Sequence, residues 1–119
     1  MRKPLDTVVL GLSLSSSWGN GHATTFRSLL RGLNADGHRV LFLERDVPWY
    51  ANQRDLPDPD FCELQYYKDV DELLQRHADR IRGADAVLIG SYVPQGVQVI
   101  DEVAALSPRL LCFYDIDTP

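Results

Sequence analysis

Residues 15–40 read SSSWGNGHATTFRSLLRGLNADGHRV, and this stretch predicts a polar turn, a helix and the start of a strand. The helix is indicated by apolar residues that recur at helical spacing: Phe26, Leu29, Leu30 and Leu33. Gly37 is expected to end the helix, because glycine takes the left-handed conformation beyond a helix end at the least cost. The helix therefore follows a glycine-containing turn and leads into a strand.

Five apolar segments predict strands, and amphipathic helices separate them. The predicted strands are residues 7–14, 40–43, 62–67, 86–90 and 109–114. Further helical stripes run over residues 70–81 and 97–106. This alternation implies parallel strands with helices on both faces, connected by right-handed crossovers. The predicted fold is a single α/β domain over residues 1–119: a Rossmann-like, doubly wound parallel five-stranded sheet of order 3-2-1-4-5 in three αβα layers.

Residues 47–61 are expected to form a long loop without regular structure. Its prolines, Pro48, Pro57 and Pro59, disfavour helix and strand, while Trp49 and Tyr50 are large apolar groups that require covering. Loops of this length in a small domain are usually functional or covered by a partner.

Composition narrows the class of protein. The chain has 12 Lys+Arg and 17 Asp+Glu, a formal charge of −5, which is the wrong sign for binding nucleic acid. Cys62 and Cys112 lie far apart and are expected to be buried thiols in strands rather than a disulfide or metal clip. No apolar run approaches the ~20 residues of a membrane-spanning helix, and residues 8–14 are too short for a signal peptide. A cytoplasmic chain without a membrane span is expected.

Ligands of such sheets bind outside the carboxyl ends of the strands where the strand order reverses, here between strands one and four. This rim would contain residues 15–22, 91–92 and 115–117. Gly19, Asn20 and Gly21 would let backbone amides approach an anion at the start of the helix, with Ser91 and Tyr92 beside them. The alternative is that these glycines only make a tight turn.

His22, in the first helical turn, is a candidate general base, since the helix dipole favours its neutral form. The alternative is that His22 caps the helix, and His38 and His77 are expected to be structural. Asp115 and Asp117 form a DxD pattern that could hold Mg²⁺, but an active-site rim role without metal is favoured. A serine triad is disfavoured because no G-x-S-x-G elbow is present.

A dinucleotide-binding loop fits this stretch less well. Thr24 stands where a third Gly or Ala belongs, and residues 15–18 separate the strand from the glycines. Glu44 nevertheless lies where a ribose-binding acid is expected. A stand-alone nucleotide- or cofactor-binding module of flavodoxin or NAD type therefore stays open as the alternative, and a receiver-like interaction domain ranks last.

The pattern GNGHATTFRSLLRGLNADGHRVLFLERD resembles the opening of many GT-B glycosyltransferases, in which one Gly-His pair starts the first helix and another precedes the second strand. The blocks WGNGH and ERDVPWY, together with GSYVPQGV and FYDIDTP, look more closely like the amino-terminal part of CgeB-type, spore-maturation-like bacterial glycosyltransferases. The resemblance runs over most of the chain.

This resemblance implies the first of two Rossmann-like domains, the acceptor-side half of an enzyme that transfers a sugar from a nucleotide-sugar donor. The partners implied are a carboxyl-terminal donor-binding domain and a small-molecule or glycan acceptor, with no cofactor beyond the donor substrate. By analogy, His22 matches the catalytic base of inverting relatives, and Gly19 and Gly21 match the loop facing the donor phosphates. The isolated domain is expected to be almost inactive, with Trp18, Trp49 and Tyr50 uncovered.

Overall fold

Five parallel strands form one sheet in the computed structural model, which describes residues 3–18 and 21–115. The strands are β1 (Asp6–Gly11), β2 (Arg39–Arg45), β3 (Glu63–Tyr67), β4 (Ala86–Gly90) and β5 (Leu111–Tyr114). All four pairings are parallel, and the strand order is β3-β2-β1-β4-β5. The predicted order is therefore confirmed.

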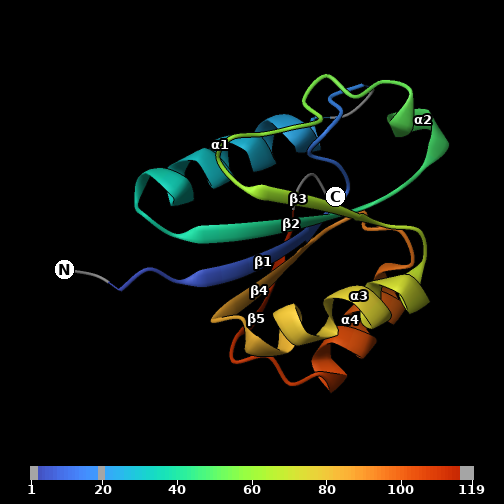
Figure 1. Cartoon of the computed structure of the whole chain (residues 1–119). Coiled ribbons are helices and arrows are strands. Elements are labelled where there is room, and N and C mark those ends of the chain that lie inside the picture. Colours follow the sequence, from blue (N-terminus) through green and yellow to red (C-terminus); the bar gives the residue numbers. More distant parts are fainter. Residues whose placement is uncertain (1–2, 19–20, 116–119) are drawn as a thin grey trace.

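Helices cover both faces of this sheet (Figure 1). Helix α1 (His22–Ala35) lies over one face, while α3 (Val70–Gly83) and α4 (Gly96–Ala105) lie together over the other. Gly37 follows α1 with a φ of +87°, the left-handed conformation that the sequence predicts for the end of this helix. The three-layer αβα arrangement is confirmed.

The apolar core is divided between the two faces because neighbouring strand residues point in opposite directions. Val9 packs with Phe26 and Phe42 beneath α1, whereas Leu10 belongs to the cluster beneath α3 and α4. Each helix thus buries its apolar stripe against alternate residues of the same strands. The central strands β1 and β2 are buried on both faces, as the continuous apolar runs predict.

Two glycines let α1 approach the sheet where the strand order reverses. A Cβ at Gly11 would lie 2.6 Å from Cε2 of Phe26 and 2.7 Å from Cζ of Phe42. A Cβ at Gly90, on the neighbouring strand β4, would lie 2.7 Å from Cζ of Phe26. The Phe26 ring, fully buried, also meets Tyr114 edge-on at 6.0 Å. Phe26 therefore fixes the amino-terminal half of α1 over the ends of β1 and β4.

Several element boundaries differ from the prediction. Strand β1 ends at Gly11 instead of residue 14, because the following backbone amides bond to a side chain of β2, described below. The loop expected to be irregular contains a one-turn helix, α2 (Pro48–Ala51), with Pro48 at a first-turn position where no amide hydrogen is needed.

The prediction of two buried cysteines in strands is wrong. Cys112 lies in β5, but Cys62 comes one residue before β3, and both side chains are only partly buried. Cys112 is accessible because β5 is an edge strand of the sheet. Burial of Cys62 still suffices to raise the pKa of its thiol to about 12.

Candidate functional site

Glu44 organises the loop that follows β1. Its side chain is fully buried, and one carboxylate oxygen accepts hydrogen bonds from the amides of Leu14 and Ser15 at 2.7 and 2.9 Å. The other oxygen accepts the Ser15 hydroxyl at 2.7 Å. Three donors thus compensate the burial of one carboxylate at the carboxyl end of β2. Glu44 could bind a ribose only by abandoning these bonds, which counts against an NAD-type module.

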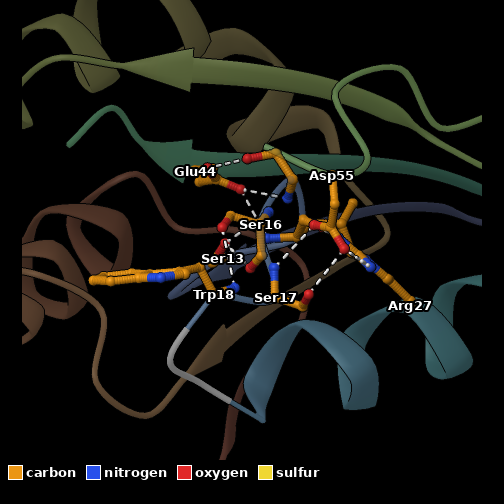
Figure 2. A network of polar contacts seen from close by, with 9 residues as sticks. Ser13, Ser16, Ser17, Trp18, Arg27, Glu44 and Asp55 are labelled. Atoms are coloured by element: carbon orange, nitrogen blue, oxygen red, sulfur yellow. Dashed lines mark hydrogen bonds and ion pairs between the residues drawn. The ribbon is translucent and has the colours of Figure 1, made fainter. Parts of the chain in front are cut away.

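A second acid, Asp55, holds the outer part of the same loop. Its carboxylate accepts bonds from the amide and hydroxyl of Ser17 at 3.0 and 2.8 Å. Arg27 of α1 pairs with it through two nitrogens, at 2.8 and 3.2 Å, and donates through Nε to the Leu14 carbonyl at 2.9 Å. Figure 2 shows these contacts converging between the loop, α1 and the segment before β3. The sequence gives no sign of this network.

These bonds occupy the backbone amides of residues 14–18, the part of the loop that precedes the predicted anion-binding turn. The five consecutive donors and their acceptors are Leu14 and Ser15 to Glu44, Ser16 to the Ser13 hydroxyl, Ser17 to Asp55, and Trp18 to the Ser16 hydroxyl. The amides of residues 14–18 are therefore satisfied by side chains of this chain and do not form a phosphate cradle. Gly19 and Asn20 lie outside the described residues, and Gly21 is the N-cap residue of α1.

We expect the stability of the domain to fall in acid through Asp55. The hydrogen-bonded Arg27 guanidinium, assisted by Ser17, holds the pKa of Asp55 well below its ordinary range. A depressed carboxyl pKa stabilises the fold above the unfolded pKa of about 3.9, and this stability is lost as the pH falls below it. Thermal unfolding between pH 5 and pH 2 should show a steeper acid loss in the wild type than in Asp55→Asn.

The matched control is Asp101→Asn, an exposed carboxylate on α4. This variant should retain the wild-type acid limb. Parallel pH profiles for the wild type and Asp55→Asn would contradict the role given to Asp55.

His22 begins α1 and is buried, with only 6% of its surface exposed. Its ring meets that of Tyr92 edge-on, with centroids 5.4 Å apart. Among the described residues, no hydrogen-bond partner faces Nδ1 of His22. The structure thus brings together two predicted site residues, one from the start of α1 and one from the segment after β4.

The segment after β4 supplies the opposite side of the rim. Ser91 is buried and its amide donates to the Tyr114 carbonyl at 2.9 Å, which extends the pairing of β4 with β5. Tyr92 has a φ of +64° and an exposed ring. Asp115 follows β5 and is exposed, one strand further along the same edge, whereas Asp117 lies outside the described residues.

Exposed aromatic side chains lie on the segments that form this rim. Trp18, Trp49 and Tyr92 are 54%, 56% and 56% exposed, and they lie on the segments that leave the carboxyl ends of β1, β2 and β4. The indole of Trp18 points away from the polar network (Figure 2). Tyr50, expected to be uncovered, is buried and stacks edge-on with Trp49 instead. We call Trp18, Trp49 and Tyr92 the aromatic rim.

Other parts of the described chain offer less chemistry. Two shallow hollows of about 380 and 310 Å³ open at the amino ends of the strands, opposite the rim, and their charged linings are paired as Arg39 with Asp6 and Arg80 with Glu63. Within residues 3–18 and 21–115 no three His, Cys, Asp or Glu side chains gather as metal ligands. No helix among these residues is long and apolar enough to cross a bilayer.

His38 and His77 take structural positions. The Leu5 amide donates to Nδ1 of His38 at 3.1 Å, which ties the start of β1 to the turn after α1. His77 lies on the buried face of α3, and this burial lowers the pKa of its imidazole.

Comparisons with known proteins give one similar solved structure. No protein-family model matches the chain, and no curated protein matches it significantly. Among solved structures, the chain is similar to the DNA/pantothenate metabolism flavoprotein from Streptococcus pneumoniae, with a TM-score of 0.43 and 12% sequence identity. The match covers 71% of this chain and 38% of that one, so the chain spans well under half of its neighbour's length.

Proposed function

We propose that this chain is the acceptor-side domain of a GT-B glycosyltransferase, the amino-terminal half of an enzyme that transfers a sugar from a nucleotide-sugar donor. The observation that carries the proposal is the aromatic rim, one member of which, Tyr92, contacts His22 edge-on. Sugar rings bind exposed aromatic faces, because their C–H groups carry partial positive charge and aromatic faces are negative. A rim of this kind at the carboxyl ends of the strands suits an acceptor with sugar or similar rings.

The saturated loop supports a division of labour between two domains. A nucleotide diphosphate requires several free amide donors or cationic groups, and the five amides of residues 14–18 already bond to side chains of this chain. Arg27, which donates to the Leu14 carbonyl of this loop, is engaged by Asp55. The donor nucleotide is therefore assigned to a second domain, and the loop serves to hold Trp18 in place.

His22 is assigned the role of general base. In an inverting transfer the acceptor oxygen forms a bond to the anomeric carbon, the bond from that carbon to the nucleoside diphosphate breaks, and the acceptor proton passes to the imidazole. The edge-on contact with Tyr92 orients the His22 ring at the start of α1.

We expect tryptophan fluorescence to report acceptor-class ligands, because both tryptophans of the chain lie on the aromatic rim. Titration with glucose, galactose, rhamnose, N-acetylglucosamine and their disaccharides should give a saturable change with at least one sugar, of about millimolar affinity. The single variants Trp18→Phe and Trp49→Phe should each remove part of the signal. A flat response to the whole panel would contradict a sugar-binding rim.

Calorimetry provides the complementary arm of this test. UDP-glucose and dTDP-glucose should give no saturable heat with this chain, since the donor site is assigned to another domain. Saturable binding of either would overturn the acceptor-side assignment. Saturable binding of NAD(H) or FMN would replace it with the cofactor-binding alternative.

A further inference from the structure

The two edge strands of the sheet, β3 and β5, differ in the side chains that they carry. Along β3, Glu63 pairs with Arg80 at 3.1 Å and Arg54 lies over the Tyr66 ring at 4.0 Å, so charged side chains protect that edge. The other edge is β5, Leu111–Tyr114, which contains no charged residue. Leu110 and Phe113 are 54% and 58% exposed there. Beside them an apolar hollow of about 230 Å³ is lined by Ile89, Ile100, Leu111, Cys112 and Phe113.

The backbone of β5 has hydrogen-bonding groups available on its outer side. The carbonyls of Leu110 and Tyr114 accept bonds from β4, from the amides of Val87 and Ser91 at 2.8 and 2.9 Å. Because successive residues of a strand direct these groups to opposite sides, Leu111 and Phe113 direct theirs outward. No strand pairs with this side within the described residues. A further strand could therefore add to β5.

The sequence around β5 is complementary to itself. In RLLCFYD, residues 109–115, Cys112 is the midpoint, with Arg109 three residues before it and Asp115 three residues after it. In an antiparallel pair centred on Cys112, each Arg109 lies opposite Asp115 of the other copy. Leu111 lies opposite Phe113 of the other copy, on the face that carries α4. Opposite charges and apolar pairs both favour this register.

The same register satisfies the backbone. Leu111 and Phe113, which direct their groups outward, lie opposite each other and can exchange both hydrogen bonds. Cys112, whose groups point to β4, becomes a non-hydrogen-bonded pair, in which the two Cα atoms lie about 4.5 Å apart. If the register shifted by one residue, residues whose backbone N–H and C=O groups point outward would lie opposite residues whose groups point toward β4. The Arg109 side chain is 81% exposed, and its contact with Asp85 is long at 3.7 Å, so that contact competes only weakly.

We propose that two copies of this chain associate through antiparallel pairing of β5, centred on Cys112, into a continuous ten-stranded sheet. The twofold axis is perpendicular to the sheet, which places α4 of both copies on the same face. On that face α4 carries Ile100, which lines the hollow, and one helical turn before it Val97, which is 78% exposed. Phe113 of one copy lies against the apolar hollow of the other. This association is independent of the proposed sugar-transfer function.

Sedimentation velocity tests the association. At chain concentrations of about 100 µM the main species should have twice the 13.4 kDa of one chain, and dilution should return the monomer. Arg109→Asp places like charges opposite each other twice and should weaken the dimer at least about tenfold. The double variant Arg109→Asp with Asp115→Arg restores opposite charges and should recover the dimer. A monomer at all concentrations, or no recovery, would overturn the proposal.

Cross-linking tests the register independently. Oxidation of the dimer by diamide should join Cys112 to Cys112 of the other copy, since paired Cα atoms at this distance permit a disulfide. Cys62→Ser should cross-link like the wild type, whereas Cys112→Ser should not. A dimer that cross-links through Cys62, or one that forms without cross-linking, would show another interface and refute this one. Circular dichroism of each variant confirms that its fold is intact.

Discussion

Replacement of Glu44 by alanine is expected to lower the free energy of unfolding by about 3–5 kcal/mol. The change leaves three buried donors, two backbone amides and the Ser15 hydroxyl, without their acceptor. Each unsatisfied donor costs about 1–3 kcal/mol, and water entering the vacated space recovers part of this. Urea denaturation followed by circular dichroism measures the loss.

Two variants separate the hydrogen bonds from other effects of this change. Glu44→Gln keeps one acceptor oxygen for the two amides, so its loss should lie between those of the wild type and the alanine variant. Asp101→Ala removes an exposed carboxylate from α4 and should change stability by less than about 0.5 kcal/mol. If Glu44→Ala cost less than about 1 kcal/mol, the loop would not depend on this carboxylate.

The consequence of Glu44 for the aromatic rim follows from the same bonds. Trp18 lies four residues after Leu14, in the loop whose amides this carboxylate holds. Loosening the loop in Glu44→Ala should therefore broaden the emission spectrum of Trp18. The spectrum of Trp49, which lies on α2, should stay unchanged. The single-tryptophan variants allow the two emission spectra to be compared directly. The bonds to Glu44 that stabilise the loop therefore also fix the position of Trp18 on the aromatic rim.

The fold could be predicted from the sequence because its signals are local and agree with one another. Alternating apolar strands and amphipathic helices specify parallel strands, and Gly37 marks the end of α1 where the structure has it. The end of β1 could not be predicted, because it depends on Glu44, thirty residues further along the chain. The one turn of α2 could not be predicted for a local reason. Pro48 is read as a helix breaker in the sequence, but proline is favourable in the first turn of a helix.

The site was less predictable because the same residue types serve several purposes. An acid at the end of the second strand suggests a ribose ligand, yet Glu44 is fully buried and binds the chain's own backbone. A charged residue within the apolar run VLFLER is a sign of such burial. Asp55 carries no comparable sign, because its partner Arg27 is twenty-eight residues away. Contact between His22 and Tyr92 follows from the strand order, whereas the burial of Tyr50 depends on loop packing.

Gly11→Ala is the second substitution with a large expected effect, a loss of about 2–3 kcal/mol. The added methyl would lie 2.6 Å from Cε2 of Phe26 and 2.7 Å from Cζ of Phe42. Both rings are fully buried and pack against each other at 5.3 Å, so neither can move without displacing α1 or β2. Gly90→Ala meets only the Phe26 ring below 3.0 Å and should cost less. Thermal and urea unfolding measure both.

Gly32→Ala is the matched control, because it makes the same chemical change where there is space. Gly32 is exposed within α1, and a Cβ there meets nothing within 4 Å. This variant should gain about 0.5–1 kcal/mol through helix propensity. Phe26→Leu removes the ring that the new methyl meets, so Gly11→Ala should cost less in that background than in the wild type. Equal costs in both backgrounds would mean that the methyl is excluded by the sheet itself, and that Phe26 does not set the distance of α1.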